Sequence, residues 1–366
     1  MNGADLFKVT TLGLFEKRLE GDNSLMELAR LRFSEAGMGA ETPASTPEQL
    51  QWALNFRPGE HAPVIVHLDR ELNLLEEQSR SRILDFAARF AGQISGLVLH
   101  DHPAMVSRRH DYVEAAWKID DQLEKIDHCP MLFIEYAVGL EPGDFSLFFS
   151  SIPDLDHVSA CLDVGHVGIR AARMAYARSH GGEDVCVLKS QAARLPQLIA
   201  DVEDAVAAGS AAVLDLLKVI SALKKPVHLH LHDAHPLSTF SSFGVSDHLS
   251  FLAEIPLNFG YRGLRAVRPM FGPDGLAKLV TRTLELVSHR PVSFTLEIHP
   301  TGERLPLVDA ASLFERWTDH TNAERMNHWL SVLTRNHLLL RQAIEAASRP
   351  DAGQPVSEVA PEPYII

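Results

Sequence analysis

The chain has 366 residues, 46% of them hydrophobic and 22% charged, and its formal net charge is −14. This composition is ordinary for a soluble globular protein, and the length suits either two average domains or one (β/α) barrel. The acidic balance disfavours nucleic-acid binding, which depends on neutralising phosphates. The sequence contains no run of about 18 apolar residues, which excludes a membrane-spanning helix.

The start of the chain and its cysteines bear on where the protein works. The first residues lack a basic segment followed by an apolar one, so no secretory signal is predicted. Three widely spaced cysteines favour reduced thiols over a disulfide framework or a zinc–thiolate site. We therefore expect a cytoplasmic protein.

Short apolar runs alternate with longer helical patterns along almost the whole chain. This alternation predicts parallel strands joined by crossover helices. Strands are expected at 7–12, 39–42, 63–67, 96–100, 130–135, 158–163, 227–233 and 291–297. Helices are expected at 23–35, shortly after 47, and at 77–90, 112–126, 188–223, 309–316 and 323–347. Eight strands are the number that closes a (β/α)8 TIM barrel, so we predict that α/β fold.

The barrel pattern is not interrupted by a recognisable linker. We therefore predict a single domain over 1–347, followed by a Pro-rich tail over 348–366. The step between the strands at 158–163 and 227–233 is longer than an ordinary crossover. The segment 167–229 suits either a lid over the site or a contact between copies of the chain, so a homo-oligomer is one expectation.

The strand at 227–233 alternates between apolar and polar residues, as strands do when their two faces meet different surroundings. His228, His230 and His232 share one face, and Asp233 follows them. Holding three imidazoles beside a core is costly unless something binds them. A divalent metal ion is the usual binding partner of neutral imidazole, and hydrogen bonding within the protein is the plainer alternative.

Potential metal ligands recur at the C-terminal ends of six consecutive strands. These residues are His67, His100, Glu135, Asp163, His230 and Glu297. Active sites of (β/α)8 barrels lie at the C-terminal mouth, so the six side chains are expected to converge there. His166, after a tight turn, and His248, on a long loop, are expected to join them. Crowded carboxylates repel one another, and divalent cations remove that repulsion.

Five short motifs stand at or near these strand ends. They are Phe133-Ile134-Glu135, Leu162-Asp163-Val164-Gly165-His166, His230-Leu231-His232-Asp233, Asp247-His248-Leu249 and Leu296-Glu297. Together they resemble the motifs of the xylose-isomerase-like TIM barrels, a superfamily of sugar isomerases, sugar epimerases and abasic-site endonucleases. The resemblance covers roughly residues 60 to 300.

The resemblance implies two kinds of metal site. The isomerases and epimerases hold one metal with four residues, which match Glu135, Asp163, His230 and Glu297. The endonucleases bind three metals and add histidines, which match His67, His100, His166 and His248. They also carry an Asp two positions before the last histidine, where this chain has Ser246. A third metal is therefore disfavoured, and we expect two ions of Zn, Mn, Fe or Co.

The preferred function is a metal-dependent isomerase or epimerase acting on a small anionic sugar, with Glu135 and Glu297 as the catalytic carboxylates. The alternative is a multinuclear metallohydrolase that cleaves a phosphodiester. Oxidative chemistry at iron and a non-catalytic binding protein remain open. His102, Arg262 and Arg265 are candidate substrate-binding residues, because a cation near the mouth suits an anionic group; solvated loop charge is the alternative for the arginines.

Overall fold

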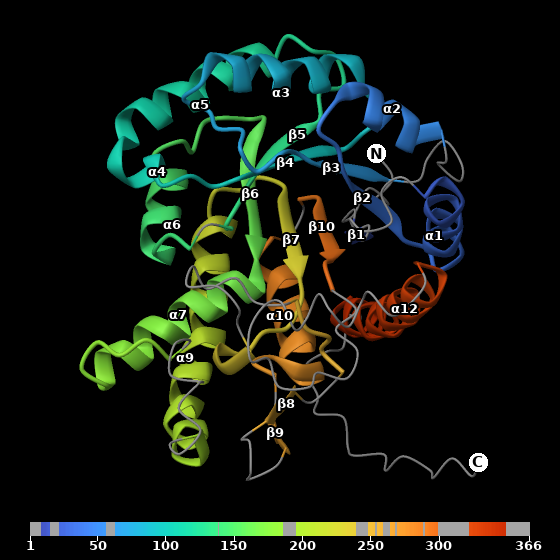
Figure 1. The fold of residues 1–366 in the computed structure, drawn as a ribbon. Helices are drawn as coiled ribbons and strands as arrows, with labels where there is room; N and C mark the ends of the chain where they lie inside the picture. Colours follow the sequence, from blue (N-terminus) through green and yellow to red (C-terminus); the bar gives the residue numbers. More distant parts are fainter. Residues whose placement is uncertain are drawn as a thin grey trace.

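A closed barrel of eight parallel strands forms the centre of the molecule (Figure 1). The strands are β1 (Val9–Leu14), β2 (Gly39–Pro43), β3 (Val64–His67), β4 (Gly96–His100), β5 (Met131–Glu135), β6 (Val158–Asp163), β7 (Val227–Leu231) and β10 (Val292–Leu296). Around the barrel the order is β1-β10-β7-β6-β5-β4-β3-β2. The predicted α/β TIM-barrel fold is thereby confirmed.

The structure is a computed structural model, and it describes part of the chain. The described residues are 9–14, 22–55, 63–137, 139–185, 195–238, 248–252, 255–258, 264–267, 269–287, 290–298 and 322–348. The expected helix at 309–316 and residues 349–366 of the tail lie outside these ranges.

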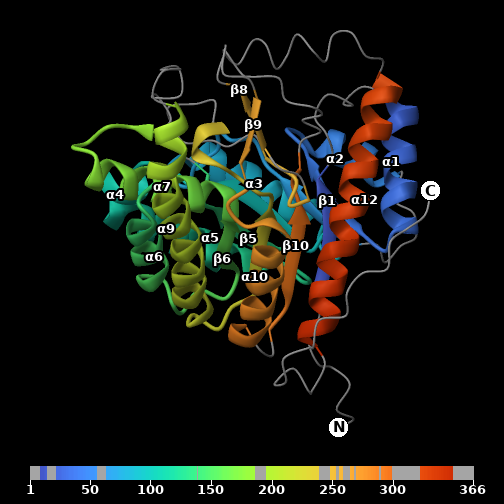
Figure 2. The same cartoon turned by 90° about the horizontal axis from the view of Figure 1, so that it is seen from below.

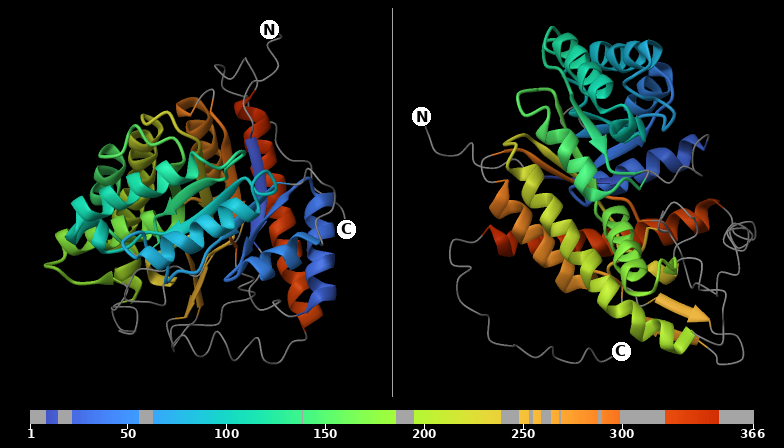
Figure 3. Two further views of the ribbon diagram at one scale, coloured as in Figure 1. Left: turned by 90° about the horizontal axis from the view of Figure 1, so that it is seen from above. Right: turned by 90° about the vertical axis from the view of Figure 1, so that its left-hand side faces the viewer.

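Helices cover the outside of the barrel, as Figures 2 and 3 show. They are α1 (Asn23–Glu35), α2 (Pro47–Asn55), α3 (Glu77–Arg89), α4 (Ala104–Ser107), α5 (Arg109–Leu123), α6 (Pro142–Ser150), α7 (Val164–Ser179), α9 (Leu195–Ser221), α10 (Gly272–Leu286) and α12 (Asn322–Ala347). Phe33 in α1 meets Trp329 in α12 edge to face, with ring centroids 5.7 Å apart. This contact packs a helix from late in the chain against the first helix.

The inside of the barrel is filled by a small apolar layer. Its members are Leu12, Ile65, Val98, Phe133 and Cys161, all buried. Side chains alternate along a strand, so the residue two positions later also faces inward, one layer nearer the C-terminal mouth. In β3, β4, β5 and β6, the residue two positions after the apolar-layer residue is His67, His100, Glu135 and Asp163, respectively.

The strand register brings the polar ends to one level. His100 pairs with Glu135 across β4 and β5, and Asp163 pairs with His230 across β6 and β7. Parallel neighbours lie about 4.8 Å apart, so inward side chains at paired positions come within reach of one another. The polar side chains therefore gather at the mouth, because the strands that carry them end in register.

Four α-helices of the structure lie outside the helices predicted from the sequence, namely α4, α6, α7 and α10. α7 begins at Val164, so His166 lies in the first turn of a helix and not in a tight turn. Asp163 caps this helix, because its Oδ1 accepts the His166 N–H at 2.7 Å. An Asp that caps a helix and an Asp that ends a strand look alike in sequence, which hides the start of the helix.

The chain between β7 and β10 is not one long loop. It contains the short helix η2 (Pro236–Ser238), the antiparallel pair β8 (Ile255–Asn258) and β9 (Leu264–Val267), and α10. α10 buries Leu276, Leu279 and Val280, the i, i+3, i+4 spacing of an amphipathic helix. Within the described ranges, no helix combines the length and the apolarity that crossing a bilayer would need.

Candidate metal centre

The mouth of the barrel gathers the side chains that the sequence singled out at the strand ends, together with His166, His248 and one further histidine, His232. They form three overlapping groups, and within each group one potential ligand atom per residue lies within 4.8 Å of the others. Group A is His67, His100 and Glu135; group B is Glu135, Asp163, His230 and Glu297; group C is Asp163, His166, His232 and His248.

Group A joins the ends of β3, β4 and β5. Nε2 of His67 lies 3.1 Å from Oε2 of Glu135, and Nε2 of His100 lies 3.3 Å from the same oxygen. Nδ1 of His67 lies 3.2 Å from the Leu68 carbonyl oxygen, to which it can only donate. In the neutral ring Nε2 is therefore the atom left to bind a cation.

Group B lies at the centre of the mouth, between β5, β6, β7 and the end of β10. Nδ1 of His230 is 3.2 Å from Oε1 of Glu135 and 3.0 Å from Oε2 of Glu297. That oxygen of Glu297 is buried and makes no hydrogen bond with the described residues. Three carboxylates and one imidazole, the set that the resemblance assigns to the isomerases, thus lie together.

Group C is built on the carboxylate of Asp163. Nε2 of His232 lies 2.8 Å and 3.0 Å from its two oxygens, and Nδ1 of His166 lies 3.5 Å from Oδ2. The rings of His232 and His248 have centroids 4.1 Å apart. His232 occupies the group from the position just after β7; it lies on the predicted histidine face but was not among the predicted ligands.

Two carboxylates connect the three groups. Oε2 of Glu135 faces His67 and His100, whereas its Oε1 faces His230. Asp163 is likewise shared, because it is a member of both group B and group C. Oε1 of Glu297 also reaches Nε2 of His248 at 3.4 Å, which brings group B close to group C. The arrangement is one continuous row of donors and not three separate clusters.

A second polar layer lies below group B, inside the barrel, and its carboxylate, Glu41, was not predicted from the sequence. Glu41 on β2 is fully buried; its Oε1 is 2.9 Å from Nε2 of His230 and its Oε2 is 3.0 Å from Nε2 of His228. Thr295 donates to Oε2 at 2.6 Å, and Ser293 lies 2.7 Å from Nδ1 of His228. The one sequence feature that could have indicated this layer is the position of Glu41, a single carboxylate at the centre of β2, which has little apolar alternation.

Burial and charge act against each other in these groups. Burial alone would raise the pKa of Glu135, but the charges of His230 and His100 and hydrogen bonds from His230 and His67 hold it well below its usual value. Burial alone would lower the pKa of His230, yet the acidic groups around it, including Glu41 and Glu135, raise this pKa well above the usual value for histidine. Burial lowers the pKa of His100 to about 4, so this ring is neutral at pH 7. In the absence of a cation, charged imidazoles balance the carboxylates.

The donor set fits divalent metal ions. Both ring nitrogens of His166 are buried without a hydrogen bond to the described residues, a costly state that a bound cation relieves. Mixed imidazole and carboxylate donors suit Zn, Mn, Fe and Co. Metal binding would displace protons from the charged histidines, because only neutral imidazole coordinates.

The candidate substrate-binding residues are placed differently. Nδ1 of His102 accepts the backbone N–H of Ala104 at 3.1 Å, at the start of α4, and its contact with substrate stays a prediction. Arg265 lies in β9, and its side chain is not described. Arg262 lies outside the described residues.

Comparison with known proteins adds little beyond the barrel itself. No protein-family model matches the chain, and no curated protein matches it. The carboxyl transferase domain of pyruvate carboxylase from Rhizobium etli is similar at 11% identity and a TM-score of 0.36 in its structure with 3-bromopyruvate. The structure of the same domain with pyruvate and biocytin is similar at 10% identity and a TM-score of 0.36. Both matches cover 96% of this chain, which spans half the length of those structures.

Proposed function

We propose that this chain is a multinuclear metal-dependent hydrolase that cleaves small phosphodiesters, within the xylose-isomerase-like superfamily that its motifs resemble. The observation that supports this function is the sharing of Glu135 and Asp163 between neighbouring donor groups. Shared carboxylates favour metal ions held as neighbours, the arrangement that acts on phosphoesters. Such ions supply a hydroxide nucleophile at neutral pH and stabilise charge on the phosphate oxygens.

The residues of the chain take distinct parts in this reaction. Water adds to phosphorus and loses a proton, one ester P–O bond breaks, and the leaving alkoxide takes up a proton. Glu297 is the most open carboxylate of group B, with 12% side-chain exposure against 3% for Glu135 and 0% for Asp163. We assign Glu297 to take that proton from the attacking water, because a general base must lie within hydrogen-bond reach of the proton that it abstracts; solvent then returns a proton to the leaving alkoxide.

A small substrate agrees with the charge of the molecule. The net charge of −14 disfavours a long polyanion, which needs many cationic contacts along its backbone. A single phosphodiester needs only the cations bound in the groups. We therefore propose a small molecule as the substrate, in place of duplex nucleic acid.

A metal-dependent sugar isomerase or epimerase is the second candidate, and group B favours it. Its four residues can hold a single ion, with Glu135 and Glu297 both facing Nδ1 of His230. That reaction needs carboxylates free to move a proton between neighbouring carbons. Both oxygens of Glu135 face imidazoles, so this residue is better suited to connecting two donor groups.

Metal content and turnover, measured together, test the proposal. We expect at least two Mn or Zn ions per chain by elemental analysis and hydrolysis of methyl 4-nitrophenyl phosphate that a chelator abolishes. Glu297→Gln should lower kcat by about 100-fold, and elemental analysis of the variant separates loss of the base from loss of an ion at group B. One ion per chain, no ester hydrolysis, and exchange of carbon-bound hydrogen of a sugar phosphate with deuterated water would support the isomerase instead.

A further inference from the structure

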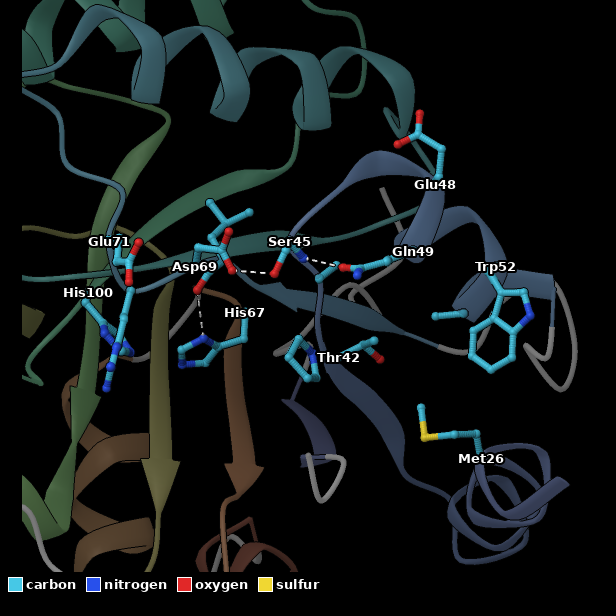
Figure 4. Close-up of a pocket in the computed structure, with 15 residues that line it drawn as sticks. Met26, Thr42, Ser45, Glu48, Gln49, Trp52, His67, Asp69, Glu71 and His100 are labelled. Atoms are coloured by element: carbon cyan, nitrogen blue, oxygen red, sulfur yellow. Dashed lines mark hydrogen bonds between the residues drawn. The ribbon is translucent and has the colours of Figure 1, made fainter. Parts of the chain in front are cut away.

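A cavity of about 690 Å³ opens beside group A, on the side of the barrel formed by α1, α2, β2 and β3 (Figure 4). Its volume is in the range that small-molecule sites occupy. His67 and His100 belong to its lining, so the cavity is continuous with the candidate metal centre. Its other walls include Met26, Ser45, Gln49, Trp52, Ala53 and Glu71.

The end of the cavity away from the histidines is apolar. Trp52 on α2 and Met26 on α1 lie across from each other there (Figure 4). An indole and a polarizable thioether are surfaces against which a planar ring packs well. A sugar in the same place would leave its hydroxyl groups against carbon atoms of these walls, which is unfavourable.

Gln49 supplies a fixed polar group at the rim between the two ends. Its Oε1 accepts the backbone N–H of Ser45 at 2.8 Å and that of Thr46 at 3.3 Å. These bonds fix the orientation of the amide, so Nε2 is the part of it that can donate to a ligand. A planar ring with acceptor atoms on its edge would match one donor beside two apolar walls.

The acidic residues near this rim are compensated by arginines. Oδ2 of Asp69 lies 2.9 Å from Nη2 of Arg82, and Oε1 of Glu48 lies 3.3 Å from Nη1 of Arg89. Arg70 and Glu71, whose charges are opposite, also line the cavity. An anionic ligand can therefore approach this end of the mouth without meeting an unbalanced row of carboxylates.

We infer that this cavity binds the base of a nucleotide, so that the phosphodiester cleaved at the metal groups carries a nucleoside on one side. The inference rests on the proposed function and adds the substrate class to it. The phosphate lies at the histidine end, the ribose spans the middle, and the base packs against the wall that contains Trp52 and Met26. The cavity thus selects nucleoside phosphodiesters over plain sugar phosphates.

Calorimetric titration of the metal-loaded protein with adenosine 5′-monophosphate and with ribose 5-phosphate tests this inference. The two ligands share ribose and phosphate and differ by the base. We expect the nucleotide to bind at least about tenfold more tightly, since stacking of a base on an aromatic side chain contributes this much or more. Trp52→Ala should remove that preference without weakening ribose 5-phosphate, and Trp52→Phe should keep most of it.

Trp117→Ala is the matched control, because Trp117 is exposed on α5 and lies outside the cavity lining. Equal affinity of wild-type protein for the two ligands, or a preference that survives in Trp52→Ala, would overturn the base site. The comparison in wild-type protein decides even if Trp52→Ala does not fold. Hydrolysis of methyl 4-nitrophenyl phosphate without a nucleotide preference would refute the base site alone; a nucleotide preference without hydrolysis would refute the hydrolase alone.

Discussion

Glu41 and His230 form a buried contact that decides which ring nitrogen meets the mouth. Oε1 of Glu41 lies 2.9 Å from Nε2 of His230, and neither side chain is exposed. Nε2 therefore donates to the carboxylate, and Nδ1 is left as the ligand atom that faces Glu135 and Glu297. A carboxylate behind a ligating histidine fixes the tautomer and raises the basicity of the ring, so Glu41 is a positioning residue.

Replacing this carboxylate should weaken metal binding without touching a proposed ligand. We expect Glu41→Gln to lower the affinity for Zn²⁺ by about 10- to 100-fold, because the amide has no charge with which to hold the His230 N–H. Competition against a chromogenic chelator measures the affinity. Glu114→Gln removes an exposed carboxylate on α5 and is the control. An unchanged affinity in Glu41→Gln would remove the positioning role.

The ring of His232 packs directly on the backbone of α7 at Gly165. Any side chain at position 165 would therefore push this ring out of group C. A Cβ at position 165 would lie 2.0 Å from Cε1 of His232. The ring cannot retreat without losing Asp163, so we expect Gly165→Ala to lower metal content and the free energy of unfolding, the latter by about 1–3 kcal/mol. Elemental analysis and urea unfolding measure the two effects.

Gly168→Ala, one turn along the same helix, is the matched control for this substitution. A Cβ there would meet Sδ of Met270 at 2.4 Å, which is part of a flexible side chain that can move. We expect a smaller loss of stability and full metal content. Equal metal content in the two variants would mean that His232 does not bind an ion.

His232 itself can be tested against a neighbouring buried histidine. Removing His232 takes away one of the three imidazoles of group C, so His232→Ala is expected to lose about one metal ion per chain while the remaining metal is retained. His235 is also buried, but its Nδ1 accepts the Leu237 N–H and it belongs to none of the groups. His235→Ala should therefore retain its metal. Loss of metal from both variants would indicate general disruption of the segment after β7.

The strand positions could be predicted because each buried strand is short, apolar and bounded by a polar residue. That pattern located β3 to β6 to within a residue at either end, and β4 and β6 without error. It also located the C-terminal residues that the structure brings together. α7 and α10 were missed because one begins at a capping residue inside a motif and the other follows a stretch of mixed composition.

The inner layer of the site could not be predicted in the same way. Glu41 and His230 are 189 positions apart, and their contact depends on how the barrel closes. β2 reads Gly-Ala-Glu-Thr-Pro, which has no apolar alternation to show that position 41 faces inward. His232 lies on the predicted histidine face, but its contact with Asp163 could not be read from the sequence, because the register of β6 and β7 pairs Asp163 with His230 and His232 lies just after β7.

The charges of the mouth predict how the metal-free protein responds to alkaline pH. Burial lowers the pKa of His67 and His232, but Glu135 and Asp163 respectively raise these values above 6.5, and the pKa of His230 is raised further. A histidine whose pKa is raised in the folded state stabilises it below the unfolded pKa of about 6.5. That contribution is lost as the pH rises through the folded pKa.

We therefore expect the free energy of unfolding of the metal-free protein to fall between pH 7 and pH 9. The slope is about 1.4 kcal/mol per pH unit for each histidine that is protonated only in the folded state. With Zn²⁺ bound, these rings are already neutral and coordinated, so the decline should disappear. Urea unfolding at pH 7, 8 and 9, with chelator and with Zn²⁺, measures both profiles. A metal-free profile that is flat or rises over this interval would mean that the carboxylates of the mouth do not hold charged imidazoles.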